Sequence, residues 1–418
     1  MSPDRSPQLF TQYPGVEPIA YYRKGGFHPI HIDDVLQNRY RIVNKLGYGS
    51  YGTIWLVEDL DSGRCAALKV LAAEVSKEVS EVAILRHLKQ RQLNVGNANG
   101  QELLMEFLDD FKVEGPNGTH QCIVTEVLGP SIGTDVDEIY DEERYPIEIA
   151  KKLVAQVIRG VAYLHSCGVV HGDLHVGNIL LRIPGIEQIS RQDLQKYLGE
   201  PYKKPLSRRD GEPVISTPHE PKYVVPSPER LELLRLCLSS PEAVYLKICD
   251  FGEAFLWDDK SVITQLNTPC VYAAPEIIFH DHISPAVDVW ALAVLIHMVL
   301  SGGYLLFNSY HGIKKEVLRE MVLTLGKLPD RWWTKWEDRS EYFDENGTFI
   351  GDGTKLPPVS GKFLKIPSDR MEGEELKELE RVIRMMVSYG IMDRISAAEV
   401  VRLTPESWMK SSHKGVGA

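Results

Sequence analysis

Hydrophobic and polar positions alternate in the first third of the chain, as they do in half-buried strands. The alternation runs over 40–46 and 53–57, on either side of a glycine cluster, and 123–128 is a further short apolar run. Between them, apolar residues recur at spacings of three and four, at Val75, Val79, Val82, Leu85 and Leu88. Period two is typical of strands, and the three-four spacing is typical of an amphipathic helix. The pattern predicts a β-hairpin closing over a glycine-rich turn, then a helix and a further strand.

From residue 146 onward the pattern becomes helical. Helices are predicted over four segments, 149–164, 289–300, 313–325 and 376–389. The second contains the longest apolar run, but its 12 positions fall short of the roughly 20 apolar residues that a membrane-spanning helix needs. We therefore expect a buried core helix there and no membrane segment. The chain is predicted to be α+β, with a β-rich N-terminal unit and a helical C-terminal one.

Residues 182–244 interrupt this pattern. They hold nine of the 25 prolines in 63 positions, which predicts an insert with little regular structure. Within it, Ser190 and Asp193 have the spacing of a capping box that opens a short helix, and 228–238 is a second candidate helix.

Composition narrows the class of protein. The 418 residues include 47 Lys and Arg against 58 Asp and Glu, a net charge of −11. Such a charge argues against nucleic acid as the main partner and permits basic partners. The six cysteines are scattered without a Cys-x-x-Cys pair, which indicates reduced thiols in the cytoplasm or nucleus. No uninterrupted apolar stretch is present in 1–20, so no signal peptide is expected.

The glycine cluster is the first candidate for chemistry. Gly47, Gly49 and Gly52 follow the pattern G-x-G-x-x-G between two predicted strands. Glycines let backbone amides approach phosphate oxygens that a Cβ would keep away. A plain hairpin turn would explain the same residues.

Lys69 ends an apolar strand, where its charge needs a partner. Glu81 on the predicted helix is the natural candidate, with Glu78 one turn earlier as the fallback. Such an ion pair would hold the ammonium ready for the α- and β-phosphates of a nucleotide. A solvated surface lysine is the alternative.

The segment 171–181 is the most informative of the chain. It reads His-Gly-Asp-Leu-His-Val-Gly-Asn-Ile-Leu-Leu and places Asp173 and Asn178 five residues apart on a predicted loop. Asp173 can accept a proton from an attacking hydroxyl, and Asn178 can hold a metal ion. Asp250, in the sequence Asp-Phe-Gly after a short apolar strand, supplies a second carboxylate suited to Mg²⁺.

In this order the motifs resemble those of eukaryotic protein kinases over about 40–408, and within them the SR-protein kinases (serine/arginine-rich protein-specific kinases), including divergent fungal-type members. Four short segments carry the closer resemblance. Residues 22–28 read Tyr-Arg-Lys-Gly-Gly-Phe-His, and 38–40 read Asn-Arg-Tyr. Residues 122–129 read Cys-Ile-Val-Thr-Glu-Val-Leu-Gly, and 247–254 read Lys-Ile-Cys-Asp-Phe-Gly-Glu-Ala. The insert also stands where that family carries its spacer.

The resemblance implies a bilobal protein kinase fold. It divides the chain into an N-terminal extension (1–39), an N-lobe with hinge (40–128), a C-lobe (129–408) that carries the insert 182–244, and a tail (409–418). It also implies two structural pairs, in which Glu276 of Ala-Pro-Glu binds Arg394 and Asp288 braces the catalytic loop.

By the same resemblance, the cofactors are ATP and Mg²⁺. Lys69, Glu81 and Asp173 are the catalytic residues, and Asn178 and Asp250 are the metal ligands. Thr125 is the gatekeeper, and Glu126 and Leu128 offer backbone hydrogen bonds to adenine. The residues expected to sandwich the adenine ring are Leu46, Ile54, Ala67 and Leu180.

Three positions depart from the kinase pattern. Gly172 replaces the arginine that in many kinases binds a phosphorylated activation loop, so we expect a loop active without phosphate on Thr264 or Thr268. His175 stands where a lysine is usual, and Ala273 where relatives in the wider CMGC group carry arginine.

The departures leave three functions open. The expected one is a serine/threonine kinase acting on Arg/Ser-rich or other basic proteins, among them splicing-related ones, as a monomer in the cytoplasm or nucleus. The loop also resembles those of aminoglycoside and choline kinases, so a small-molecule phosphotransferase remains an alternative, as does a nucleotide-binding scaffold without turnover. An acidic run is either a docking surface for basic substrates or a solvated face, and it comprises Glu337, Asp338, Glu341, Asp344, Glu345 and Asp352.

Overall fold

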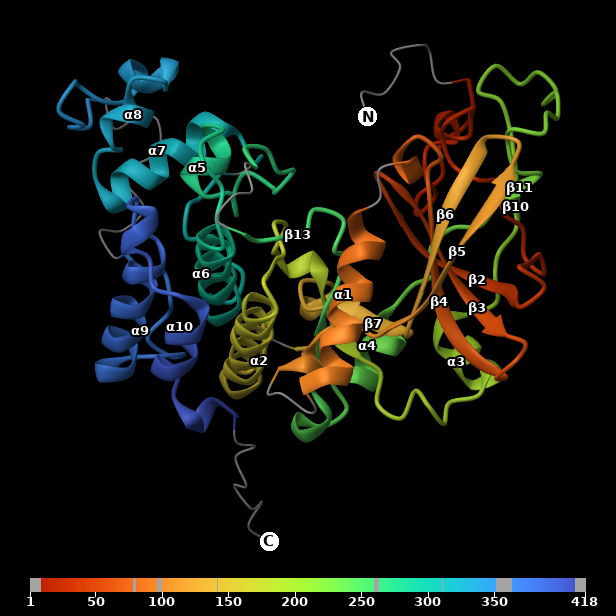
Figure 1. The fold of residues 1–418 in the computed structure, drawn as a ribbon, viewed down its shortest axis with the longest axis horizontal. Coiled ribbons are helices and arrows are strands. Elements are labelled where there is room, and N and C mark those ends of the chain that lie inside the picture. The colour runs from red at the N-terminus through yellow and green to blue at the C-terminus, as the bar shows by residue number, and fades with distance from the viewer. Residues whose placement is uncertain are drawn as a thin grey trace, which may run out of the picture. The chain divides into compact units, whose positions relative to one another are not determined.

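The computed structural model describes residues 9–77, 80–95, 100–140, 142–258, 263–309, 311–350 and 363–409 (Figure 1). The fallback partner Glu78 and the acidic Asp352 lie outside these residues. The chain divides into two units. The first comprises 1–89, 105–130 and 181–239, and the second comprises 90–104, 131–180 and 240–418.

The first unit is built on a six-stranded antiparallel sheet in the order β1-β2-β3-β4-β6-β5. Its strands are β1 (Val35–Leu36), β2 (Tyr40–Gly49), β3 (Gly52–Asp59), β4 (Arg64–Leu71), β5 (Phe107–Gly115) and β6 (Gly118–Thr125). Alternate side chains of β2, β3, β4 and β6 form one buried core, among them Ile42, Trp55, Leu68 and Val124. This is the face that the period-two pattern predicts.

Helix α1 (Ser80–Val95) contains Val82, Leu85 and Leu88 of the predicted amphipathic helix. The first predicted position, Val75, lies instead in a 3₁₀ turn, Val75–Lys77, that precedes α1. Strand β7 (Leu128–Ser131) continues the chain after β6.

The N-terminal extension is held to the sheet by a buried ion pair. The ammonium of Lys45 in β2 binds the carboxylate of Glu17, which also accepts a hydrogen bond from the Tyr22 hydroxyl. Burial lowers the pKa of Lys45, and the attraction of Glu17 only partly offsets this. A buried charge is tolerated when it is paired in this way.

Residues 182–239 of the insert pack with the first unit, although their place in the chain assigns them to the C-lobe. It contains α3 (Arg191–Leu198), the short strands β10 (Lys204–Pro205) and β11 (Tyr223–Val224), which pair antiparallel, and α4 (Leu231–Cys237). The Ser190 side chain accepts a hydrogen bond from the Asp193 amide, which confirms the predicted helix start. Two contacts hold the insert to the sheet: Asn44 Nδ2 donates to the Gly199 carbonyl at 3.0 Å, and Arg191 binds Glu58 at 3.0 Å.

The second unit is mainly helical. Its helices are α2 (Ile147–Ser166), α5 (Pro275–Ile278), α6 (Ala286–Ser301), α7 (Lys314–Leu325), α8 (Asp330–Trp333), α9 (Gly373–Met386) and α10 (Ala397–Leu403). Helices α2, α6, α9 and α10 lie side by side (Figure 1). Strand β8 (Val169–Val170) pairs with β13 (Phe255–Leu256), and β12 (Leu246–Ile248) is also short. Strand β9 (Ile179–Arg182) begins in the second unit, and its last two residues belong to the first.

Helix α6 is buried around almost its whole circumference, which confirms the core helix predicted from the longest apolar run. Its polar side chains Asp288, His297 and Ser301 are buried and hydrogen-bonded. Among the described residues, no helix has both the length and the hydropathy needed to cross a membrane.

Candidate active site

The glycine-rich turn joins β2 to β3 as predicted, with Gly49 opposite Gly52 in the ladder. A Cβ on Gly52 would lie 2.4 Å from the Val70 carbonyl oxygen, so packing against β4 requires a glycine there. A Cβ on Gly49 would meet nothing within 4 Å, so packing does not explain that glycine. Open space over Gly49 suits a backbone that must approach a phosphate closely.

The insert reaches this turn through one side chain. The Arg230 guanidinium, just before α4, donates a hydrogen bond to the Leu46 carbonyl. A Cβ on Gly47 would lie 3.4 Å from the same guanidinium. A residue 184 positions away in the sequence therefore contacts the first strand of the glycine-rich turn.

Lys69 and Glu81 form the predicted ion pair between β4 and α1. Nζ of Lys69 lies 3.0 Å from each carboxylate oxygen of Glu81. The Glu81 side chain is 5% exposed and that of Lys69 is 22% exposed, so the ammonium keeps access to solvent. A carboxylate that holds a lysine in one position also fixes the place where its ammonium can meet a ligand.

The residues expected around adenine in the first unit lie on neighbouring strands. Ala67 of β4 pairs with Thr125 at the end of β6, and the Thr125 hydroxyl donates to the Glu126 carbonyl at 3.3 Å. The Glu126 amide donates to the Glu106 carbonyl at 3.1 Å.

The remaining adenine candidates are placed by their strands. Ile54 lies on β3 opposite Lys69, Leu46 lies on β2, and Leu128 begins β7. Leu180 lies on β9 in the second unit and is half-buried.

In the second unit, Asp288 at the start of α6 organises the catalytic loop. Its carboxylate accepts the backbone amides of His171 at 2.7 Å and Gly172 at 2.9 Å, and it lies 3.0 Å from Nε2 of His165 at the end of α2. Burial alone would raise the pKa of Asp288, but these partners hold it below the ordinary range. The brace implied by the kinase resemblance is present.

Asp173 and Asn178 meet within this loop. Nδ2 of Asn178 donates to the Asp173 carbonyl at 2.9 Å and to Oδ2 of Asp173 at 3.2 Å. Because the amide nitrogen is used by Asp173, the amide oxygen of Asn178 is the atom that could bind a metal. Oδ1 of Asp173 is buried and has no hydrogen-bond partner among the described residues.

Asp250 is tied to the same loop through its neighbour Cys249. The Cys249 amide donates to the Asn178 carbonyl at 2.9 Å, and the Cys249 carbonyl accepts from Nε2 of His171 at 3.0 Å. Asp250 itself has φ of 59°, a left-handed conformation that a non-glycine residue adopts at a cost. Such strain is typical of functional sites, and here it fixes the carboxylate directly after the anchored Cys249.

The donor set fits a magnesium ion. Asp250 and Asn178 offer the carboxylate and amide oxygens that this ion prefers. Among the described residues no three His, Cys, Asp or Glu side chains form a metal cage, so a metal here would need oxygen ligands from substrate or water. Mg²⁺ in phosphoryl-transfer sites is bound in this way, by one or two protein ligands together with phosphate oxygens.

Residues Asn267 and Thr268 of the activation segment are held by hydrogen bonds, although the catalytic loop has Gly172 where many kinases have an arginine. The Thr268 hydroxyl donates to the Gly172 carbonyl at 2.6 Å, and the Asn267 side chain donates to Glu253 at 2.7 Å. Further on, Glu276 and Arg394 form the expected ion pair, with both side chains fully buried.

The comparisons with known proteins agree with this geometry. The protein kinase domain family matches residues 40–190 and 236–404. The serine/threonine-protein kinase SRPK of Physarum polycephalum is 31% identical over 387 residues, 90% of this chain and 88% of that protein. Human SRSF protein kinase 3 is 36% identical over 161 residues, 38% of this chain and 28% of its own. The protein kinase dsk1 of Schizosaccharomyces pombe is 36% identical over 169 residues, 39% of this chain and 30% of its own.

The chain belongs to the SR-protein kinase family. It is a serine/threonine protein kinase with the bilobal α+β kinase fold, and as such it takes ATP and a protein as substrates. The small-molecule phosphotransferase and the scaffold without turnover are not favoured, because the similarity to protein kinases extends over most of the chain.

Proposed function

We propose that this kinase transfers the γ-phosphate of Mg-ATP to serine or threonine in Arg/Ser-rich or similarly basic proteins. The arrangement of Asp173, Asn178 and the anchored Asp250 carries the proposal for the chemistry. The substrate class is supported by the printed names of the relatives SRPK and SRSF protein kinase 3 and by the net charge of −11.

In the proposed mechanism, Asp173 accepts the proton of the attacking hydroxyl. Its buried Oδ1 has no protein partner among the described residues, and a substrate hydroxyl would supply one. Lys69, held by Glu81, donates to phosphate oxygens of the nucleotide. Asn178 and Asp250 would hold Mg²⁺, which neutralises charge on the phosphates.

We further propose that the kinase is a monomer of the cytoplasm or nucleus, with the lobe boundaries given by the family resemblance. None of the six cysteines, all of which the structure describes, forms a disulfide, which supports a reducing compartment. The acidic run is partly balanced by cations, because Glu341 binds Lys315 at 3.1 Å and Glu345 lies 3.5 Å from Arg339. This favours a solvated face over a docking surface.

Purified protein incubated with Mg-ATP and an Arg/Ser-repeat peptide tests the proposal. We expect phosphoserine by mass spectrometry, and its loss in Asp250→Ala and Asp173→Ala. A peptide with lysine in place of arginine separates recognition of the guanidinium from attraction to any positive charge. Phosphorylation of choline or an aminoglycoside with the peptide untouched would refute the substrate class, and nucleotide binding without any transfer would refute the catalytic assignment.

A further inference from the structure

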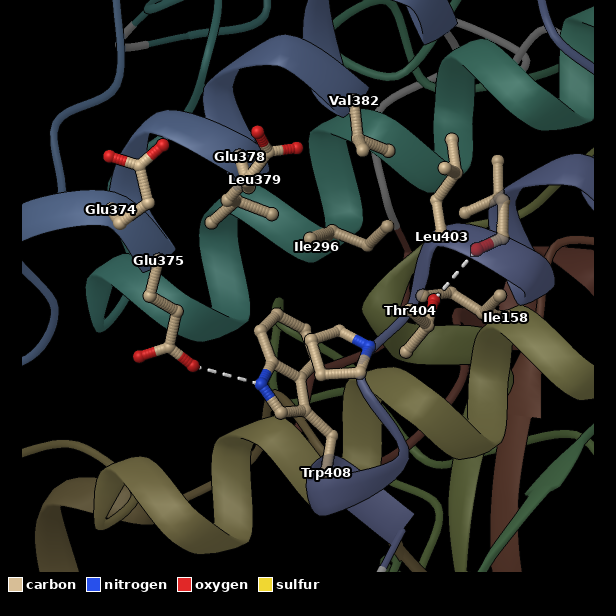
Figure 2. A pocket seen from close by; sticks show the side chains of 12 residues that line it. Ile158, Ile296, Glu374, Glu375, Glu378, Leu379, Val382, Leu403, Thr404 and Trp408 are labelled. Atoms are coloured by element: carbon tan, nitrogen blue, oxygen red, sulfur yellow. Dashed lines mark hydrogen bonds between the residues drawn. The ribbon is translucent and has the colours of Figure 1, made fainter.

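The second unit contains a cavity of about 360 Å³ that the proposed chemistry does not use (Figure 2). It lies among α2, α6, α9 and α10 and the 3₁₀ turn Glu406–Met409. Its size falls within the range of small-molecule pockets in proteins. The residues that line it come from sequence positions as far apart as Ile158 and Trp408.

The floor of the cavity is apolar. Side chains that line it and are buried include Ile158 of α2, Ile296 of α6, Leu379 of α9 and Val400 of α10. The indole ring of Trp408 closes one side (Figure 2). A ligand here would be bound mainly by removal of apolar surface from water.

The polar atoms of the wall are already used by the protein. Nε1 of Trp408 donates to Glu375 at 3.0 Å, and the Thr404 hydroxyl donates to the Val400 carbonyl at 2.8 Å (Figure 2). Lys151 also binds Glu375 at 2.8 Å. Burial works against ionisation of Glu375, but its hydrogen bonds from Lys151 and Trp408 keep its pKa below the ordinary value. The interior therefore presents carbon to a ligand and offers few hydrogen bonds.

The mouth of the cavity has one sign of charge. The exposed residues that line it are Leu403, Pro405, Glu374 and Glu378. The lining residues include three glutamates, Glu374, Glu375 and Glu378, and no lysine or arginine. Each of the two exposed glutamates has an ion pair on its own helix, Glu374 with Lys377 at 3.5 Å and Glu378 with Arg381 at 2.9 Å. Both pairs are exposed and therefore weak, and neither cation lines the cavity. A ligand with a carboxylate head would meet repulsion at this mouth, and one with an ammonium head would meet attraction.

We propose that this cavity binds an amphipathic amine, with its hydrocarbon body on the apolar floor and its ammonium group at Glu374 and Glu378. The helices that form the floor also hold the catalytic loop, because α2 ends next to His165 and α6 begins next to Asp288. An occupied cavity would therefore stabilise the unit that carries Asp173. This inference does not depend on the identity of the protein substrate.

The proposal is tested with three probes that share a ten-carbon hydrocarbon tail and differ in the head group. They are decylamine, decanol and decanoate, each used below its critical micelle concentration. We expect saturable binding of one decylamine per chain by calorimetry, with a rise in the melting temperature of the full chain. Decanoate should bind about tenfold more weakly than decylamine, because Glu374 and Glu378 attract an ammonium group and repel a carboxylate group. The preference should shrink in high salt.

Two variants locate the site. Val382→Trp should abolish decylamine binding, because Val382 of α9 lines the cavity and a larger side chain would fill it. The double variant Glu374→Gln and Glu378→Gln changes exposed residues, so it should fold normally and lose most of the preference for amine over carboxylate. Glu380→Gln is the matched control, since Glu380 lies on the same helix, binds Arg384 at 2.7 Å and does not line the cavity.

Equal affinity for the three probes, or unchanged decylamine binding in Val382→Trp, would overturn the proposal. Binding of a lysine-flanked, leucine-containing peptide at this site, without binding of decylamine, would also overturn the proposal. The cavity would then be a docking site for a protein. Loss of the head-group preference in Glu380→Gln would also count against the assigned mouth.

Discussion

Nε2 of His175 lies 3.5 Å from Oδ2 of Asp173, the proposed catalytic base. Nδ1 of the same ring accepts the backbone amide of Gly177 at 3.1 Å, so it carries no proton in this arrangement. The proton of a neutral imidazole is then on Nε2, the ring nitrogen that lies 3.5 Å from the Asp173 carboxylate. The residue that stands in place of the usual kinase lysine therefore contacts the base directly.

Replacement of His175 tests whether this contact matters for turnover. His175→Ala should lower kcat by about tenfold to a hundredfold with little change in the KM for ATP, because a donor near the reacting groups is lost. His175→Lys should keep most of the activity, since the ammonium also supplies a donor. Steady-state kinetics with a saturating Arg/Ser peptide measures both, and an alanine variant as active as the native enzyme would contradict the role.

The parts of the site that could be predicted from the sequence are those fixed by local pattern. Gly49 and Gly52 flank a hairpin turn because alternating strands surround them, and Lys69 pairs with Glu81 because a lysine at a strand end and a glutamate on the next helix need each other. The Arg230 contact with Leu46 could not be predicted, since it comes from a proline-rich insert that has no periodicity. For the same reason the sequence does not predict that the insert packs with the first unit.

Gly172 is a second departure whose physical reason only the structure gives. Its φ is +76°, and a Cβ would lie 2.8 Å from the Glu253 carbonyl oxygen, so an arginine does not fit this backbone. Gly172→Ala should destabilise the fold by more than the roughly 1–2 kcal/mol that left-handed backbone alone costs, and it should also lower kcat by displacing the loop next to Asp173.

Gly168→Ala is the matched control for that variant. Gly168 has a similar φ of +73°, but a Cβ there would meet nothing within 4 Å. Urea unfolding of the two variants separates backbone strain from the clash. Equal losses of stability would show that the contact with Glu253 has no energetic weight.

The activation segment should not need phosphate. Thr268 donates its hydroxyl proton to the Gly172 carbonyl, so the side chain already has a structural partner in the catalytic loop. Phosphatase treatment should leave activity unchanged, Thr268→Ala should lower kcat several-fold, and Thr268→Glu should not restore it because glutamate supplies no proton to the carbonyl. Mass spectrometry that finds phosphate on Thr264 or Thr268, with activity lost on its removal, would refute the expectation.

His297 should make the stability of the second unit sensitive to mild acid. The ring is buried in α6; Nε2 accepts the Lys365 amide at 2.9 Å, and Nδ1 lies 2.9 Å from the Tyr304 carbonyl, to which it donates. Burial lowers the pKa of His297 to about 4 from the ordinary 6.5. Between these values the unfolded chain binds a proton that the folded chain does not, so stability falls as pH drops from 6.5 toward 4 and changes no further below that.

The size of this effect follows from the difference in proton binding. At about pH 5 the loss from His297 should be about 2 kcal/mol relative to neutral pH. His28, whose pKa burial also lowers to about 4, adds a similar slope, so the native curve alone cannot be assigned to one ring. His297→Gln removes one titrating group and lowers stability at neutral pH. The further loss of stability between neutral pH and pH 5 should be about 2 kcal/mol smaller in this variant than in the native kinase. Urea unfolding at several pH values measures it, and parallel curves for the variant and the native kinase would contradict the prediction.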